Sequence, residues 1–111
     1  MIQKTVQLEP LILQNIVDHA VKALKPLKII LFGSRAEGRA LGKSDIDLLV
    51  VLDSSIDRML KHQIANRLSE IAGVRVQLIP MLVEQFEETK DIIGGIAYPA
   101  NKYGVVIYEK S

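Results

Sequence analysis

Two short segments of this sequence carry residue types that could do chemistry together. Gly33-Ser34-Arg35 directly follows an apolar run, and Asp45-Ile46-Asp47 directly precedes another. A strand that ends in Gly-Ser and turns into a short helix presents free backbone N–H groups, which attract anions. The Ser34 hydroxyl could donate a hydrogen bond to a phosphate oxygen, and Arg35 could neutralise its charge. The first segment therefore predicts a phosphate loop.

The second segment indicates a metal site. Residues two apart in a strand point to the same side, which places Asp45 and Asp47 on one face roughly 6–7 Å apart. At an effective dielectric of about 20, their repulsion is about 2–3 kcal/mol. Such a pair favours a hard cation between its members, and Mg²⁺ (or Mn²⁺) prefers carboxylate and phosphate oxygens. Taken singly, the two segments also fit a tight turn and a solvated pair of aspartates.

The two segments are more specific together than apart. Only a short connection, residues 39–44, separates them. For both to face one ligand, the end of the first strand must lie beside the start of the second, which predicts antiparallel neighbours. A triphosphate on the loop and a divalent cation on the aspartates would then share one site, as phosphoryl and nucleotidyl transfer require.

The elements that must position this site follow from apolar spacing and breakers. Helical spacing predicts a helix over 11–24, and a second helix that begins near Ser54 and Asp57 and ends at Gly73. One short helical turn is expected at 36–39, and a short helix after Pro80. Gly94-Gly95 and Pro99 are interpreted as breaks in the chain. Strands are predicted at 27–32, 45–52, 74–79 and 104–108.

This alternation of helices and strands predicts an α+β fold, with a mixed sheet of about four strands and flanking helices. Phe32-Gly33-Ser34-Arg35-Ala36-Glu37-Gly38, followed by Ser44-Asp45-Ile46-Asp47-Leu48, resembles the Gly-Ser … Asp-x-Asp signature of DNA polymerase β-like nucleotidyltransferases. More narrowly, it resembles the minimal nucleotidyltransferases (MntA-like antitoxins) found beside small helical HEPN-domain proteins. The resemblance covers nearly the whole chain, so residues 1–111 are interpreted as one minimal nucleotidyltransferase domain.

The resemblance implies specific roles. Gly33 and Ser34 would hold the β- and γ-phosphates of ATP or another nucleotide, and Asp45 and Asp47 would bind Mg²⁺. A hydroxyl would attack the α-phosphate and release pyrophosphate. In members paired with HEPN proteins the acceptor is a tyrosine of the partner, which receives AMP, and the two proteins act as toxin and antitoxin. This chain would be the antitoxin.

One position departs from the family pattern. The family supplies a third carboxylate from the next strand, where this sequence has Val76-Gln77-Leu78-Ile79. Gln77 stands at that third catalytic position; glutamine is neutral, a weaker metal ligand and unable to act as a base. Asp53 or Glu84 is an alternative source of the carboxylate, although neither matches the family position.

Composition limits the alternatives. The chain has 111 residues, no cysteine and a formal net charge of +1. These features fit one domain in a reducing cytoplasm and give no direct evidence for nucleic acid binding. The apolar runs are too short to span a membrane. A hydrophobic content of 49% favours a partner protein or a homo-oligomer. Three hypotheses remain: a nucleotidyltransferase, a degenerate relative that binds nucleotide or partner, and a structural domain with an incidental motif.

Overall fold

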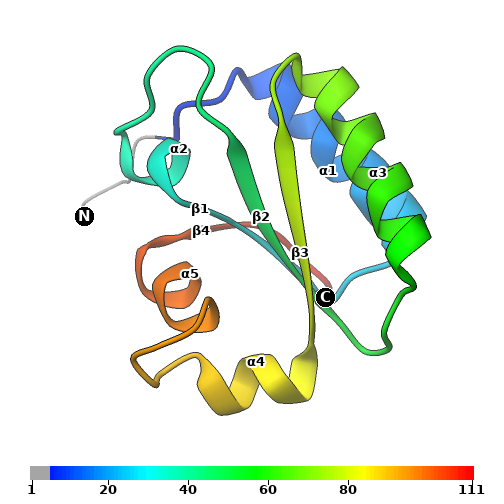
Figure 1. Ribbon diagram of the computed structural model, residues 1–111, viewed down its shortest axis with the longest axis vertical. Coiled ribbons are helices and arrows are strands. Elements are labelled where there is room, and N and C mark those ends of the chain that lie inside the picture. Colours follow the sequence, from blue (N-terminus) through cyan, green and yellow to red (C-terminus); the bar gives the residue numbers. More distant parts are fainter. Residues whose placement is uncertain (1–5) are drawn as a thin grey trace.

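The structure, a computed structural model, describes residues 6–111. These residues form a four-stranded mixed sheet with helices packed against it. Helices cover both of its faces (Figure 1). The elements in chain order are α1 (Pro10–Leu24), β1 (Lys28–Phe32), α2 (Ser34–Glu37), β2 (Ile46–Leu52), α3 (Arg58–Ala72), β3 (Val76–Leu82), α4 (Val83–Thr89), α5 (Ala97–Tyr103) and β4 (Val105–Glu109). The predicted α+β fold with a mixed sheet is confirmed.

The strand order is β3-β2-β1-β4, so β1 and β2 lie at the centre of the sheet. β1 runs antiparallel to both β2 and β4, and β2 runs parallel to β3. The predicted antiparallel pairing of the first two strands is therefore confirmed. It places Phe32 opposite Asp47, and the parallel pairing places Asp47 beside Gln77.

Both faces of the central strands are buried, which explains why β2 is a continuous apolar run rather than an alternating one. Ile46 and Leu48 pack into a cluster with α1 and α3, whereas Leu49 and Val51 pack into a second cluster with Phe86 of α4 and residues of α5. Figure 1 shows the two helical layers on opposite sides of the sheet. Asp47 alternates with Ile46 and Leu48, so it belongs to the α4–α5 side.

Three local predictions need correction. The α3 N-cap is Asp57, whose carboxylate accepts a hydrogen bond from the Leu60 backbone N–H at 2.7 Å, so the helix begins after Ser54. Pro80 lies inside β3 rather than after it; β3 is an edge strand, where a missing N–H is tolerated. Pro99 lies in the first turn of α5, where proline is favoured, so a helix occupies a predicted break.

Across residues 6–111, no helix combines the length and the apolar character that crossing a bilayer requires.

Candidate functional site

The turn between β1 and α2 brings the two sequence segments into contact. Gly33 has φ 79° and ψ −160°, a backbone conformation that is open almost only to glycine. A methyl group at its Cα would lie 2.5 Å from Oδ2 of Asp47, so the carboxylate occupies the space that any other side chain would need. Gly33 therefore permits the predicted phosphate loop and the Asp47 carboxylate to lie together, and the two sequence segments are in contact as predicted.

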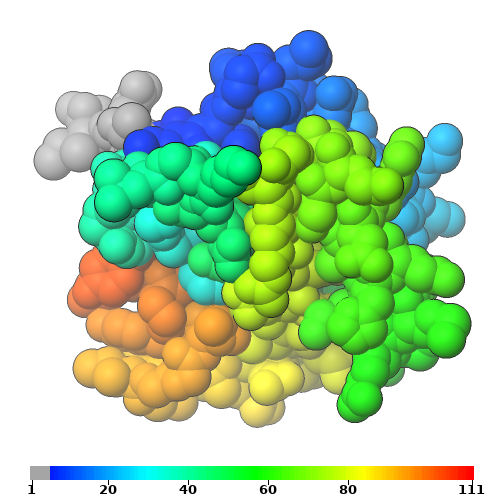
Figure 2. Space-filling view, turned by 45° about the horizontal axis from the view of Figure 1, so that its top comes forward, coloured from blue at the N-terminus to red at the C-terminus, as the bar shows by residue number. Residues whose placement is uncertain are grey.

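Ser34 is the first residue of α2, and its carbonyl accepts hydrogen bonds from later N–H groups of the same turn. The Gly33 carbonyl likewise accepts from Ala36 and Glu37, at 3.1 and 3.2 Å. The first N–H groups of a helix have no intrahelical acceptor, which leaves those of this turn suited to an anion. Figure 2 looks onto this end of the molecule, where the cyan turn lies deeper than the teal loop after α2 and the orange α5.

The two aspartates influence each other electrostatically. Asp45 immediately precedes β2 and Asp47 is its second residue. The pKa of Asp47 is raised above its ordinary value, first by partial burial and then by the negative charge of Asp45, while the positive charge of Arg75 opposes the rise. A carboxylate pair of this kind gains most from a cation placed beside it.

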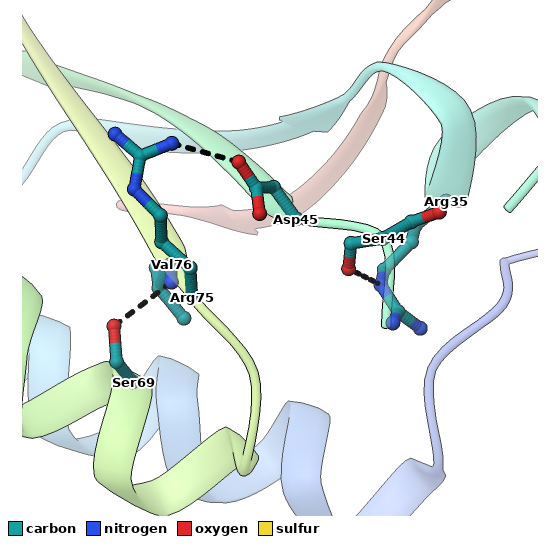
Figure 3. Close-up of polar contacts among 6 residues, drawn as sticks. All are labelled: Arg35, Ser44, Asp45, Ser69, Arg75 and Val76. Carbon is teal, nitrogen blue, oxygen red and sulfur yellow. Dashed lines mark hydrogen bonds and ion pairs between the residues drawn. The ribbon is translucent and has the colours of Figure 1, made fainter. Parts of the chain in front are cut away.

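Arg75 is a functional candidate that the sequence patterns did not single out. Its Nη1 lies 2.7 Å from Oδ2 of Asp45, and Figure 3 shows the guanidinium reaching across from the start of β3. The main chain here is held on both sides: the Arg75 carbonyl accepts from the Ile46 N–H at 2.9 Å, and the Val76 N–H donates to Ser69 Oγ at 2.8 Å. Strand parity gave a usable signal, because Arg75 precedes Gln77 by two residues.

Gln77 lies beside Asp47 in the parallel β2–β3 ladder, and it is exposed. Neighbouring register positions of parallel strands share a face, so the Gln77 side chain lies on the same side of the sheet as Asp47, and its role as the third catalytic position stays a prediction. Asp53 and Glu84 follow the opposite ends of these strands, beyond Leu52 and in α4. They cannot substitute, since seven residues of strand separate the two ends by about 20 Å.

Arg35 has backbone partners that the sequence did not predict. Its guanidinium donates to three backbone carbonyls, those of Gln7 at 2.8 Å, Ser44 at 2.9 Å and Gly42 at 3.2 Å. The side chain of Gln7 in turn bonds both the N–H and the carbonyl of Ala40. The structure thus shows Arg35 fastening the loop between α2 and β2 (Figure 3), and its contact with phosphate stays a prediction.

The donor set fits a divalent cation with a reduced ligand number. Asp45 and Asp47 offer anionic oxygens of the kind that Mg²⁺ prefers, and the Gln77 amide oxygen is a neutral donor beside them. Within residues 6–111 no group of three or more histidine, aspartate or glutamate side chains could hold a metal ion. A divalent cation at Asp45 and Asp47 would therefore need further oxygen ligands, such as those of a phosphate group.

Comparison with known proteins identifies one family whose profile matches the sequence and several solved structures with a related fold. The profile of the nucleotidyltransferase domain family matches residues 13–98. No curated protein matches the chain. A solved toxin–antitoxin structure with AMP-PNP has a TM-score of 0.72 at 19% identity, covering 88% of this chain and 73% of that one.

Two further solved structures have the same fold. The tri-AMPylated HEPN toxin of Shewanella oneidensis in complex with an MNT antitoxin gives a TM-score of 0.63 at 18% identity, covering 91% of this chain and 72% of that one. A toxin–antitoxin MntA–HepT structure gives 0.66 at 17% identity, with coverages of 92% and 74%. The chain therefore belongs to the nucleotidyltransferase domain family, and its fold is that of the minimal, polymerase β-like nucleotidyltransferases.

Proposed function

We propose that this protein is a Mg²⁺-dependent nucleotidyltransferase that binds ATP and transfers AMP to a hydroxyl, a tyrosine of a partner HEPN-type protein, as the antitoxin of a toxin–antitoxin pair. The contact between Gly33 and Asp47 carries this proposal. It brings an anion-binding turn and a metal-binding carboxylate into one place. Neither a solvated turn nor an incidental motif would require that contact.

Each residue of the proposed site has a separate role in nucleotide binding or transfer. The N–H groups of the turn after Gly33 and the Ser34 hydroxyl would hold the β- and γ-phosphates. Asp45 and Asp47 would hold Mg²⁺, which when bound supplies charge neutralisation at the phosphates. The acceptor oxygen forms a bond to the α-phosphorus, the bond to the β-phosphate oxygen breaks, and pyrophosphate leaves. With Gln77 beside Asp47, the hydroxyl proton passes to solvent rather than to a third carboxylate, which predicts slow transfer.

The loop beside the site can contribute to a protein contact. Leu41 lies in the loop that joins α2 to β2 and ends at Asp45, and it is 83% exposed. A partner protein bound there would cover an apolar side chain next to the proposed site. The solved structures with the same fold include a complex of an MNT antitoxin with a HEPN toxin, which supports a partner of that class.

A second candidate is a degenerate antitoxin that binds nucleotide or partner without catalysis. The neutral Gln77 at the third-carboxylate position favours it. Incubation with labelled ATP, Mg²⁺ and the HEPN protein encoded nearest to it separates the two. Label on the partner supports transfer, and loss of that label when Asp45 and Asp47 are both changed to Asn ties it to this site. Nucleotide-dependent thermal stabilisation without label supports the degenerate antitoxin, and the absence of both contradicts either function.

A further inference from the structure

The carboxylate of Asp45 already has a cation beside it. Nη1 of Arg75 lies 2.7 Å from Oδ2, yet both side chains remain open to solvent, Arg75 at 66% and Asp45 at 42% exposure. Ion pairs this exposed contribute little to folding stability. Arg75 is therefore not required to hold the fold, and its pairing with a metal-binding residue calls for another explanation.

The base of the Arg75 side chain is fixed while its tip is free to move. Two backbone contacts hold the residue: its carbonyl accepts from the Ile46 N–H at 2.9 Å, and the next N–H, that of Val76, donates to Ser69 Oγ at 2.8 Å. Among residues 6–111, Asp45 is the hydrogen-bond and ion-pair partner of the guanidinium. Figure 3 shows it extending from the start of β3 over the start of β2.

The guanidinium also changes the charge that the site offers to a metal. A three-carboxylate site presents three negative charges, whereas Asp45 and Asp47 together with Arg75 present a single net negative charge. A divalent cation must compete with Arg75 at Oδ2 of Asp45. A displaced guanidinium then lies within the site with donors that suit phosphate oxygens.

We propose that Arg75 binds a phosphate of the nucleotide, and that its ion pair with Asp45 keeps the guanidinium beside the site until the nucleotide binds. On binding of nucleotide, Asp45 exchanges the guanidinium for the divalent cation, and Arg75 turns to the triphosphate. This inference rests on the proposed function. It assigns to Arg75 positive charge at the triphosphate beyond that of the divalent cation, which agrees with the neutral Gln77 beside Asp47.

Arg75→Gln should therefore have opposite effects on two affinities. In the absence of nucleotide, Mn²⁺ measured by electron paramagnetic resonance should bind about tenfold more tightly, because a repelling charge and a competitor for Asp45 are gone. In saturating Mn²⁺, ATP measured by calorimetry should bind about tenfold or more weakly, because a charged hydrogen bond to phosphate is lost. Adenosine binding should not change.

Arg67→Gln is the matched control. Arg67 is also an exposed arginine in an ion pair, with Glu70 at 3.5 Å, but it lies on α3 in the layer on the other side of the sheet. The control should leave Mn²⁺ and ATP affinities unchanged. Circular dichroism checks that both variants fold.

Each alternative result has a distinct meaning. Unchanged Mn²⁺ affinity in Arg75→Gln overturns the competition for Asp45. Tighter Mn²⁺ with unchanged ATP overturns the phosphate contact. Failure of the wild type itself to bind ATP with Mn²⁺ overturns the proposed function, and this differs from failure of the Arg75 proposal alone, in which wild type and variant bind ATP equally.

Discussion

Gly33 is the position at which the fold and the site depend on the same atoms, so Gly33→Ala is the most informative substitution. An alanine there must adopt φ 79° and ψ −160°, which costs about 1–3 kcal/mol. Its methyl group would also lie 2.5 Å from Oδ2 of Asp47, and moving the carboxylate adds about 1–3 kcal/mol. We expect a total loss of roughly 2–6 kcal/mol, which a domain of mid-range stability, about 10 kcal/mol, withstands.

Gly73→Ala isolates the two contributions. Gly73 ends α3 with φ 74° and has open space around its Cα, so alanine there should cost only the backbone strain of about 1–2 kcal/mol. Urea unfolding measures both losses, and calorimetry measures ATP affinity in Mn²⁺. Gly33→Ala should lose ATP binding while Gly73→Ala keeps it.

A double variant completes the test. Asp47→Ala removes the atom against which the new methyl group collides, so Gly33→Ala should destabilise that background less than the wild type, by the about 1–3 kcal/mol assigned to the collision. Equal losses for Gly33→Ala and Gly73→Ala, together with intact ATP binding in both, would refute the reasoning.

Three further predictions concern the same site. Asp47→Asn should raise the free energy of unfolding at neutral pH yet abolish metal-dependent ATP binding. The pKa of Asp47 is raised in the folded state, so the stabilising contribution of its carboxyl group is present at acid pH and is lost as pH rises through that pKa. Urea unfolding at acidic and at neutral pH checks this, and a variant less stable than the wild type at neutral pH would contradict it. Ser34→Ala should weaken ATP binding by about 1.5–3 kcal/mol and leave adenosine unaffected in calorimetry, since the hydroxyl is proposed to contact phosphate alone; equal losses for both ligands would exclude that role. Gln77→Asp should tighten Mn²⁺ binding and raise AMP transfer to the partner by about 10²–10⁴-fold, because it supplies a ligand and a base; a slower variant would show that Gln77 has another role.

Features governed by local rules could be predicted from the sequence. The antiparallel pairing of β1 and β2 followed from the short connection between the two segments, and the register confirms it through Phe32 and Asp47. The family resemblance directed attention to Gln77, which the ladder places beside Asp47. Gly73 was predicted to end its helix and does so in a left-handed conformation.

Features that depend on which strands become neighbours could not be predicted. The pairing of Arg75 with Asp45 spans thirty residues and exists because β3 lies parallel to β2. Arg35 shows the same limit, since a guanidinium suits phosphate and carbonyl oxygens equally, and only the folded loop shows three carbonyls around it. Pro99 was interpreted as a break because proline suits both a turn and the first turn of a helix.

The edge position of β3 has an evolutionary consequence. Gln77 is exposed, lies on a strand with a neighbour on one side only, and contributes no side chain to either buried cluster. Substitution there leaves the core unchanged. On the proposed role of Gln77, a single change at this position could alter the catalytic rate without altering the fold.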